Sequence, residues 1–330
     1  MLLAGDIGGT KTVLAIFSTE TSTASLHPLH MQTFPSGQFG SLEAIITQFL
    51  QDQQTKIEAA SFGVAGPVVN GRSQITNLPW IIDAGIIQQT FQMEKVILLN
   101  DLESIANAVP HLQADDVATI NEGKPEPGGA IAVIAPGTGL GEAFLIWDGK
   151  RYQAHPSEGG HASFSPTTPD QCRLLAFLEQ KYKHVSFERV CSGKGIPNLY
   201  AFWRHGGRFT EPDWLRDEIQ QAADPTPVIV EAGLAKTADI CTATVQMFVD
   251  ILASEASNMA LKVLATGGVF IGGGIPPRLL NLLQTEHFIA TFAEKGRFTN
   301  LLRGMPLQVI CNPQTALLGA AWAGLDLLHG

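Results

Sequence analysis

Two segments of the chain share one pattern of apolar and polar positions. In each, an apolar run meets a short stretch of Gly and Thr, and a second apolar run follows at once, over residues 3–17 and 131–146. The residues after the first turn, Val13–Phe17, are β-branched, aliphatic and aromatic, which favours a strand over a helix. The pattern therefore predicts two β-hairpins with glycine-rich tips. Their separation of roughly 130 residues indicates a duplicated half.

Helical and strand patterns alternate along the rest of the chain, which predicts an α/β architecture. Helices are recognised by apolar residues at a spacing of three and four, and buried strands by short apolar runs. The expected helices are Ser41–Gln51 and Val245–Leu264, and the expected strands are Ala59–Val64, Lys95–Leu99 and a short run within 267–274.

Two further segments are interpreted from their Gly, Pro and Asn residues. Arg204–Pro227 is rich in Gly, Pro and charge, so we expect a surface excursion there. Asn312 and Pro313 predict the N-cap and first turn of a helix that runs through Leu328.

Bulk composition narrows the class of protein. The chain has 330 residues, of which 45% are hydrophobic, and this length favours two domains. A net charge of −10 without a dense Lys/Arg cluster argues against a nucleic-acid partner. The four cysteines are far apart and have no C-x-x-C spacing, which favours reduced thiols. No signal peptide or bilayer-length apolar run is recognised, so we expect a cytoplasmic protein without membrane contact.

The glycine tips of the two hairpins suggest phosphate binding. Backbone amides at such tips form anion-binding concavities, and glycine lets a phosphate approach without a Cβ in the way. The dinucleotide and P-loop fingerprints place their glycines before a helix, whereas strands follow here. We therefore interpret the two turns as phosphate-binding loops that close around the phosphates of a nucleotide.

Several motifs together resemble a known family. The turns at Gly5–Thr10 and Gly137–Gly141 and the segment Gly267–Gly274 look like the two phosphate motifs and the adenosine motif of the sugar kinase, actin and heat-shock ATPase superfamily. Ser157–His161 and Phe187–Gly193 narrow the resemblance to the bacterial glucokinase family. The similarity spans essentially the whole chain, and the motifs follow the family's order.

The resemblance implies a fold, a domain organisation and a set of cofactors. The fold is α/β, with two ribonuclease H-like (actin-like ATPase) domains around a deep cleft. The smaller domain is expected at residues 1–110 plus 302–330, and the larger at 111–301. The implied cofactors are ATP and Mg²⁺. The implied nucleotide-binding residues are Asp6, Ile7, Gly8, Gly9, Thr10, Lys11, Gly137, Thr138, Gly139, Gly273 and Gly274.

Polar residues at the two turns have a functional and a plainer interpretation. Asp6 is placed to hold hydrated Mg²⁺ against the phosphates, although Asp beside glycine also caps turns. The hydroxyls of Thr10 and Thr138 either donate to phosphate or satisfy their own turns. Lys11 either reaches a phosphate as a point charge or is solvated, and the family often has Asn at its place.

Asp101 is our candidate for the general base that takes the proton from a sugar 6-hydroxyl. It follows the buried run Lys95–Leu99, and polar groups at such strand ends commonly face the ligand crevice of an α/β sheet. The alternative is an N-cap of the next helix, and one carboxylate can serve both roles. Asn100 offers a donor and an acceptor to a neighbouring hydroxyl, or is a turn residue.

Three further polar residues match the family's sugar contacts, namely Glu158, His161 and Glu188. Carboxylates and imidazole suit a polyol, because each can bond vicinal hydroxyls. Glu158 and His161 also have the E-x-x-H spacing of metal ligands, but the two glycines between them argue against the helix that this spacing needs. Related repressor-type kinases have a zinc-binding cysteine cluster that this chain lacks, so structural zinc is not expected.

Taken together, the sequence predicts an ATP-dependent glucokinase that phosphorylates D-glucose to glucose 6-phosphate. The alternatives are a kinase for another hexose or an amino sugar, and a sugar-sensing regulator without turnover. The expected partner is a small-molecule sugar, with neither nucleic acid nor membrane. The oligomeric state is left open, with a homodimer as one candidate.

Overall fold

The chain forms two compact units in the computed structural model, which describes residues 1–20, 26–51, 53, 56–75 and 78–329. Unit 1 comprises Met1–Asp116, Arg151–Pro156 and Asn312–Gly330. Unit 2 comprises Val117–Lys150 and Ser157–Cys311. The domain limits that the resemblance implies stay a prediction.

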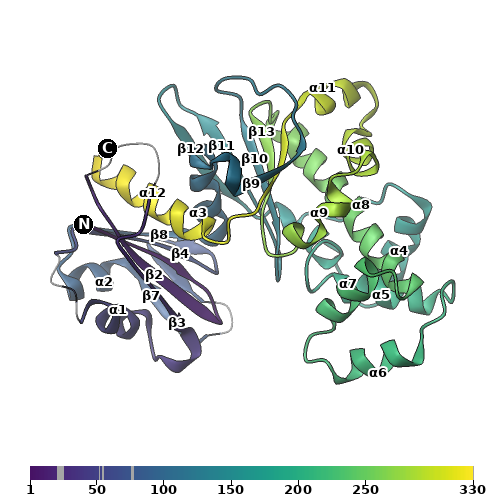
Figure 1. The fold of residues 1–330 in the computed structure, drawn as a ribbon, viewed down its shortest axis with the longest axis horizontal. Coiled ribbons are helices and arrows are strands. Elements are labelled where there is room, and N and C mark those ends of the chain that lie inside the picture. Colours follow the sequence, from purple (N-terminus) through teal and green to yellow (C-terminus); the bar gives the residue numbers. More distant parts are fainter. Residues whose placement is uncertain (21–25, 52, 54–55, 76–77, 330) are drawn as a thin grey trace. The chain divides into compact units, whose positions relative to one another are not determined.

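Unit 1 is built on a mixed sheet with the strand order β3-β2-β1-β4-β8 (Figure 1). Strand β1 pairs antiparallel with β2, so the first predicted hairpin is confirmed, and β1, β4 and β8 run parallel. A small second sheet has the order β5-β6-β7. The strands are β1 (Leu2–Ile7), β2 (Lys11–Phe17), β3 (His30–Pro35), β4 (Ala59–Val64), β5 (Val68–Val69), β6 (Arg72–Gln74), β7 (Ile81–Asp83) and β8 (Lys95–Asn100).

Helices cover both faces of the unit 1 sheet. They are α1 (Leu42–Leu50), α2 (Ala84–Phe91), α3 (Asp101–Ala108) and α12 (Thr315–His329). The prediction of a helix at Ser41–Gln51 is confirmed, and Ser41 is its N-cap, because its hydroxyl accepts from Ala44 N at 3.3 Å. The apolar side of α1, with Ile45, Ile46 and Phe49, is buried in the core that also holds Leu3.

Helix α12 brings residues from the far end of the sequence onto unit 1 (Figure 1). Its Leu317, Ala320, Ala321 and Leu325 bury the sheet face that holds Leu2, Ala4, Ala15, Phe17 and Ala59. Small residues allow this close approach. A Cβ at Gly324 would lie 2.6 Å from Leu2 Cδ1, and one at Gly319 would overlap the backbone oxygen of Ser104 on α3.

The start of α12 differs from the prediction. The helix begins at Thr315, after Asn312 and Pro313. The Asn312 side chain accepts from Gln314 N at 2.8 Å, and its backbone oxygen accepts from the Thr315 hydroxyl at 2.7 Å. Asn312 therefore stabilises the turn that leads into the helix, and it stands three residues before the first helical residue instead of directly before it.

Unit 2 contains the second predicted hairpin, which is confirmed. Strand β10 pairs antiparallel with β11, and across the sheet the order continues from β11 through β10, β13 and β14 to β9. Strand β13 runs parallel to both β10 and β14. The strands of unit 2 are β9 (Val117–Asn121), β10 (Ile131–Pro136), β11 (Leu140–Trp147), β13 (Gly268–Ile271) and β14 (Leu307–Ile310). Strand β12 (Tyr152–Ser157) belongs to unit 1 except for its last residue.

Helix α8 is long and largely buried, and other helices of unit 2 pack directly against it (Figure 1). The helices of this unit are α4 (Pro169–Glu179), α5 (Ile196–His205), α6 (Asp213–Gln221), α7 (Pro225–Leu234), α8 (Asp239–Val263), α9 (Leu280–Leu283), α10 (Glu286–Ala293) and α11 (Thr299–Gly304). The segment Arg204–Pro227 is mostly exposed, as expected of a surface excursion, but it is not a loop throughout, because it contains all of α6 and the start of α7. Pro212 is the N-cap of α6 and Pro225 is the first residue of α7. These prolines mark helix starts, not an irregular loop.

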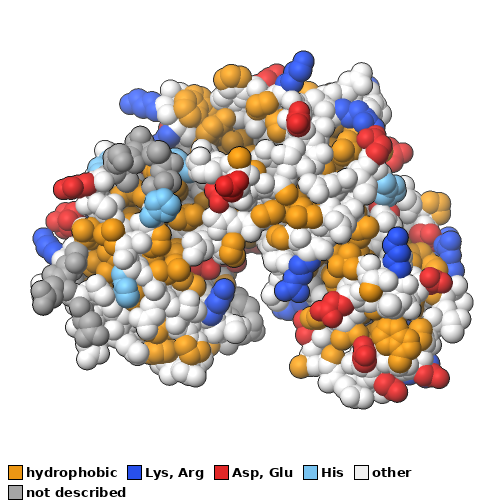
Figure 2. Space-filling model, viewed as in Figure 1, with side chains coloured by type: hydrophobic (Ala, Val, Ile, Leu, Met, Phe, Trp, Pro, Cys, Tyr) orange, Lys and Arg blue, Asp and Glu red, His pale blue; other side chains and the backbone are white. Residues whose placement is uncertain are grey.

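Charged side chains of both signs are interspersed on the face shown in Figure 2, and no basic stripe is visible there. The four cysteines are free thiols, with Cys191 and Cys241 buried. Within the described part of the chain, every helix is too short or too polar to cross a bilayer.

Candidate active site

The first glycine turn joins β1 to β2 at one end of the unit 1 sheet. Gly8 N donates to Lys11 O at 3.0 Å and closes the turn. Two buried hydroxyls support it from below. The Ser36 hydroxyl donates to Gly8 O at 2.8 Å, and Thr12 Oγ1 lies 3.0 Å from Ser36 Oγ. The turn is therefore held by the protein before any ligand arrives, which is what an anion-binding loop needs.

The predicted nucleotide residues of this turn differ in what they present. Gly8 and Gly9 are half-buried, and Thr10 and Lys11 are exposed. Ile7 is fully buried in the core, which leaves only its backbone for a ligand. The exposed part of the turn consists of backbone, one hydroxyl and one cation, a set that suits a phosphate.

Asp6 stands at the end of β1, next to this turn. Burial raises the pKa of Asp6, and the positive charge of Lys11 lowers it in part. A carboxylate that has lost water gains from a further cation in addition to Lys11. The position therefore fits the predicted magnesium role, because Mg²⁺ prefers carboxylate and water oxygens.

Asn100 and Asp101 lie at the same end of the sheet as Asp6. The parallel strands β1, β4 and β8 place Ile7, Val64 and Asn100 in one row. Neighbouring strands are about 4.8 Å apart, so the Asn100 backbone lies about 10 Å from that of Ile7. The candidate base and the first phosphate turn therefore belong to one edge of unit 1, at the carboxyl ends of its strands.

Asn100, not Asp101, is the N-cap of α3. Its Oδ1 accepts from Leu102 N at 3.0 Å, and its backbone N–H donates to Glu103 Oε2 at 3.3 Å, which completes a capping box. Asn100 Nδ2 also donates to Gly66 O at 3.1 Å. Asp101 is the first residue of the helix, and its Oδ1 accepts from Leu102 N at 2.9 Å. The strand end thus fixes both side chains.

The second glycine turn, between β10 and β11 in unit 2, is bonded directly to Glu188. Gly137 N donates to Gly139 O at 2.9 Å. Leu140 N donates to Glu188 Oε2 at 3.1 Å, and a Cβ at Gly139 would lie 2.5 Å from that oxygen. Thr138 is exposed at the tip. A predicted sugar residue and the predicted phosphate turn are therefore in contact.

Backbone from two other segments surrounds this second turn. Gly193 N donates to Gly137 O at 2.7 Å, so the segment after Glu188 is bonded to the turn. Gly273 has a φ of +87°, and a Cβ there would overlap Pro136 O. Gly274 is exposed, with open space at its Cβ position. The predicted residues Gly137, Thr138, Gly139, Gly273 and Gly274 therefore gather at one end of the unit 2 sheet.

Glu158 and His161 flank a tight turn that packs on the same strand. A Cβ at Gly160 would overlap Leu140 O, and one at Gly159 would overlap Glu142 Oε2, so only glycine fits at both positions. The side chains of Glu158 and His161 are exposed, with His161 Nε2 3.8 Å from Glu158 Oε2.

The turn with Glu158 and His161 is joined to the segment that holds Glu188. Phe187 N donates to Ala162 O at 3.0 Å, and Ser163 forms a β-bridge with Ser186. The three predicted sugar residues thus belong to one connected group in unit 2.

A pair of buried carboxyl groups lies beneath this group. Glu142 on β11 is 3% exposed and Glu255 on α8 is fully buried. Burial, followed by the neighbouring Glu255 carboxyl, raises the pKa of Glu142 to about 7. Glu255 has cationic and amide partners, since Lys262 Nζ lies 3.6 Å from its Oε1 and Asn258 Nδ2 donates to its Oε2 at 2.8 Å. We therefore assign the proton to Glu142 and the negative charge to Glu255.

This pair predicts a loss of stability as the pH rises. The folded state keeps the Glu142 proton up to about pH 7, whereas the unfolded chain releases it near pH 4.5. The contribution of this proton to the free energy of unfolding is therefore fully present below pH 4.5 and is lost as the pH rises through about 7. We expect Glu142→Gln, which stays neutral, to be more stable than wild type by about 1 to 3 kcal/mol at pH 8 but not at pH 5. Urea unfolding at both pH values measures this difference.

The control for this experiment is Glu126→Gln, which changes an exposed carboxylate in the same unit. Its effect on the free energy of unfolding should be the same at both pH values. If Glu142→Gln behaves in the same way as this control, Glu142 does not hold a proton at neutral pH.

Sequence reasoning missed the residues that support the site from below. Thr12 and Ser36 are 24 positions apart, and nothing local marks them as partners. Glu142 does leave a signal, since it is the one charged residue within the apolar run of residues 131–146. Its role follows only from Gly159, whose missing side chain leaves room for the carboxyl group.

Comparison with known proteins agrees with these features. The chain matches the family model described as Glucokinase over residues 3–326. It is 40% identical to the glucokinase of Nostoc punctiforme over 334 aligned residues, which cover 97% of this chain and 98% of that protein.

Solved structures of glucokinases have the same fold as this chain. A glucokinase from an Antarctic psychrotroph has a TM-score of 0.88 at 31% identity, with 98% of each chain covered. A ROK family glucokinase from Streptomyces griseus, in complex with glucose and AMPPNP, has a TM-score of 0.64 at 16% identity and covers 98% of this chain and 99% of its own, a likeness of fold alone. The predicted α/β fold class of the actin-like ATPases is confirmed. The match to the family model over nearly its whole length shows that this chain belongs to the glucokinase family of sugar-phosphorylating enzymes.

Proposed function

We propose that this enzyme transfers the γ-phosphoryl group of ATP to the 6-hydroxyl of D-glucose and releases ADP and glucose 6-phosphate. The observation that carries this proposal is the hydrogen bond from Leu140 N to Glu188 Oε2. It joins the second phosphate turn to a carboxylate suited to sugar hydroxyls. A phosphate held at Gly137–Gly139 and a sugar held by Glu188 would be neighbours, as phosphoryl transfer requires.

In this proposal Asp101 removes the proton of the 6-hydroxyl while that oxygen attacks the γ-phosphorus and the bond to the β-phosphate oxygen breaks. The geometry of α3 supports the role, because Leu102 N–H fixes one Asp101 oxygen at 2.9 Å. Asn100, Glu158, His161 and Glu188 would bond the remaining sugar hydroxyls. A sugar that lacks one of these hydroxyls would leave a polar group unpaired, which is the physical basis of selectivity.

The two glycine turns would bind the phosphates through backbone amides, aided by Thr10, Lys11 and Thr138. Gly273 and Gly274 would lie against the adenosine, where bare backbone admits a flat ring. Asp6 would hold Mg²⁺ through water, and the bound cation would neutralise phosphate charge. The raised pKa of Asp6 supports this assignment, since a cation offsets the loss of water around its carboxylate.

The experiment that tests the proposal is a coupled assay with ATP and Mg²⁺ across glucose, mannose, fructose and N-acetylglucosamine. We expect the highest kcat/KM with glucose. A higher value with another of these sugars would reassign the substrate. Heat of glucose binding in calorimetry without any glucose 6-phosphate would instead indicate a sugar-sensing regulator. The same assay with ADP or polyphosphate in place of ATP tests the donor.

Glu188 offers a separate test of the link between the two substrates. We expect Glu188→Ala to lower kcat/KM for glucose by about 10- to 100-fold, because a charged hydrogen-bond partner is lost from a polar site. It should also raise KM for ATP, since Leu140 N loses its acceptor on the phosphate turn. Steady-state kinetics with each substrate varied in turn measure both effects.

Glu188→Gln is the informative companion variant, because it keeps an oxygen for Leu140 N but removes the charge. We expect it to keep KM for ATP near the wild-type value. Glu179→Ala, on the exposed end of α4, is the matched control. If Glu188→Ala changes neither KM, Glu188 contacts neither substrate.

A further inference from the structure

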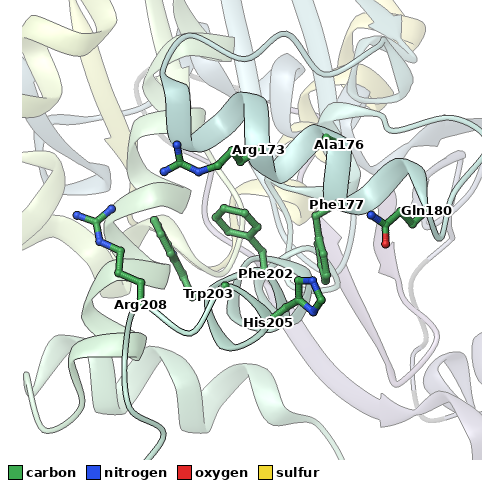
Figure 3. A pocket seen from close by; sticks show the side chains of 9 residues that line it. Arg173, Ala176, Phe177, Gln180, Phe202, Trp203, His205 and Arg208 are labelled. Carbon is green, nitrogen blue, oxygen red and sulfur yellow. The ribbon is translucent and has the colours of Figure 1, made fainter.

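A pocket lies in unit 2, and none of its lining residues belongs to the candidate active site. It has a volume of about 490 Å³ and lies between helices α4 and α5, so we call it the α4–α5 pocket (Figure 3). The residues that matter for its chemistry are Arg173, Phe177, Phe202, Trp203, His205 and Arg208. Its volume is in the range of small-molecule sites.

Aromatic rings form the apolar part of the α4–α5 pocket. The ring centroids of Phe177 and Phe202 are 5.9 Å apart, and those of Phe202 and Trp203 are 4.8 Å apart. His205 lies 5.2 Å from Phe177. Phe202 and Trp203 are 7% and 6% exposed, so packing holds them in place. A fixed set of rings favours a flat apolar ligand, because little side-chain entropy is lost on binding.

Two guanidinium groups form the polar end of the pocket. Figure 3 shows Arg173 and Arg208 on one side of the rings, with Phe177 and Gln180 on the other. Both arginines pair with the single carboxylate of Asp170, Arg208 Nη1 at 3.2 Å from Asp170 Oδ2 and Arg173 through Nη2. Two cations against one anion leave a net charge of +1 in a chain whose net charge is −10. The shared Asp170 also orients both guanidinium groups.

Trp203 adds an unsatisfied donor. Its indole Nε1 is buried and has no hydrogen-bond partner among the residues that the structure describes. Arg208 Cζ lies 5.7 Å from the centroid of the same ring. A buried donor without an acceptor costs free energy, so a ligand oxygen that accepts from it would be favoured.

We propose that the α4–α5 pocket binds a small organic anion, whose flat aromatic ring packs against Phe177, Phe202 and Trp203 while its carboxylate or phosphate pairs with Arg173 and Arg208. Arginine presents a fork of donors that matches both acidic groups, and it retains donors when one edge is bonded to Asp170. Two sources supply this chemistry, an aromatic carboxylate and a nucleoside monophosphate. The proposal does not rest on the identity of the sugar substrate.

The test is calorimetry with 2-naphthoate and with AMP, each titrated into the full chain in the presence of glucose and AMPPNP so that active-site ligands are already supplied. We expect at least one probe to bind with a Kd below about 1 mM. Binding of 2-naphthoate alone identifies the carboxylate source, and binding of AMP alone identifies the nucleotide source. If neither probe binds, the proposal is overturned.

Two variants locate the binding. Arg173→Gln combined with Arg208→Gln should weaken it at least about tenfold, because both charged donors are lost. Ala176→Glu, at an exposed lining position, should weaken it similarly by placing a negative charge in the pocket. Arg303→Gln, which removes an exposed arginine of α11 paired with Glu286, is the control and should bind as wild type does.

Kinase activity and the thermal unfolding midpoint of each variant serve as checks on folding, and both should stay at the wild-type values. Binding that persists unchanged in both pocket variants would place the probe elsewhere and overturn the proposal.

Discussion

Replacement of Asp101 by Asn is expected to lower kcat for sugar phosphorylation by about 10²- to 10⁴-fold, the range supplied by a positioned general base. Asn keeps an oxygen that can accept from Leu102 N–H, so the side chain should retain its orientation at the start of α3. It cannot accept the proton of the 6-hydroxyl. Glucose binding, measured by calorimetry, should therefore stay close to that of wild type while turnover in the coupled assay is lost.

Asp115→Asn is the matched control for this variant, because Asp115 is an exposed carboxylate of the same unit. It should leave kcat unchanged. Near-normal turnover in Asp101→Asn would remove Asp101 from the role of base. A loss of glucose binding that accounts for the whole loss of activity would make it a binding residue instead.

The second large effect is expected from Gly319→Ala, which should destabilise unit 1 by about 3 kcal/mol or more. A Cβ at this position would overlap Ser104 O, a backbone atom of α3, so α12 and α3 must move apart. Helix α12 also covers the sheet through Leu317 and Ala320, so its displacement would disturb that packing as well. Urea unfolding measures the loss, and hydrogen exchange should show reduced protection in both helices.

Gly304→Ala is the control, because its added Cβ would meet no atom within 4 Å. At this helical position alanine should be neutral or slightly stabilising. Equal stability of Gly319→Ala and Gly304→Ala would show that the two helices can separate without cost. Because α3 begins at Asp101, Gly319→Ala should also reduce kcat, although by less than Asp101→Asn.

Local features of the sequence predicted the parts of the fold that depend on local interactions. Both glycine-tipped hairpins could be recognised because turn residues and runs of strand-forming residues act within a few positions. The strand Ala59–Val64 and the helix starting after Ser41 were found for the same reason. Helices α6 and α7 were missed, since Pro212 and Pro225 suggested loops although they stand at helix starts.

The candidate site, too, could be predicted from the sequence only where local features mark its residues. Asn100 and Asp101 were found because they follow a buried strand, but which of them caps α3 depends on backbone angles that the residue types do not determine. The support beneath the site could not be predicted. Glu142 and Glu255 are separated by more than a hundred positions, and only the folded chain brings their carboxyl groups close enough for Glu142 to keep its proton.

The return of α12 to unit 1 has a consequence for how the chain is made. A ribosome completes the sheet strands of unit 1 by residue 100 but must add roughly 200 further residues before α12 emerges. At common rates of synthesis this takes roughly 10 to 40 s. During this time the sheet face that holds Leu2, Ala4 and Phe17 is not yet covered by α12. Unit 2 can fold earlier in translation than unit 1, although its sequence begins later.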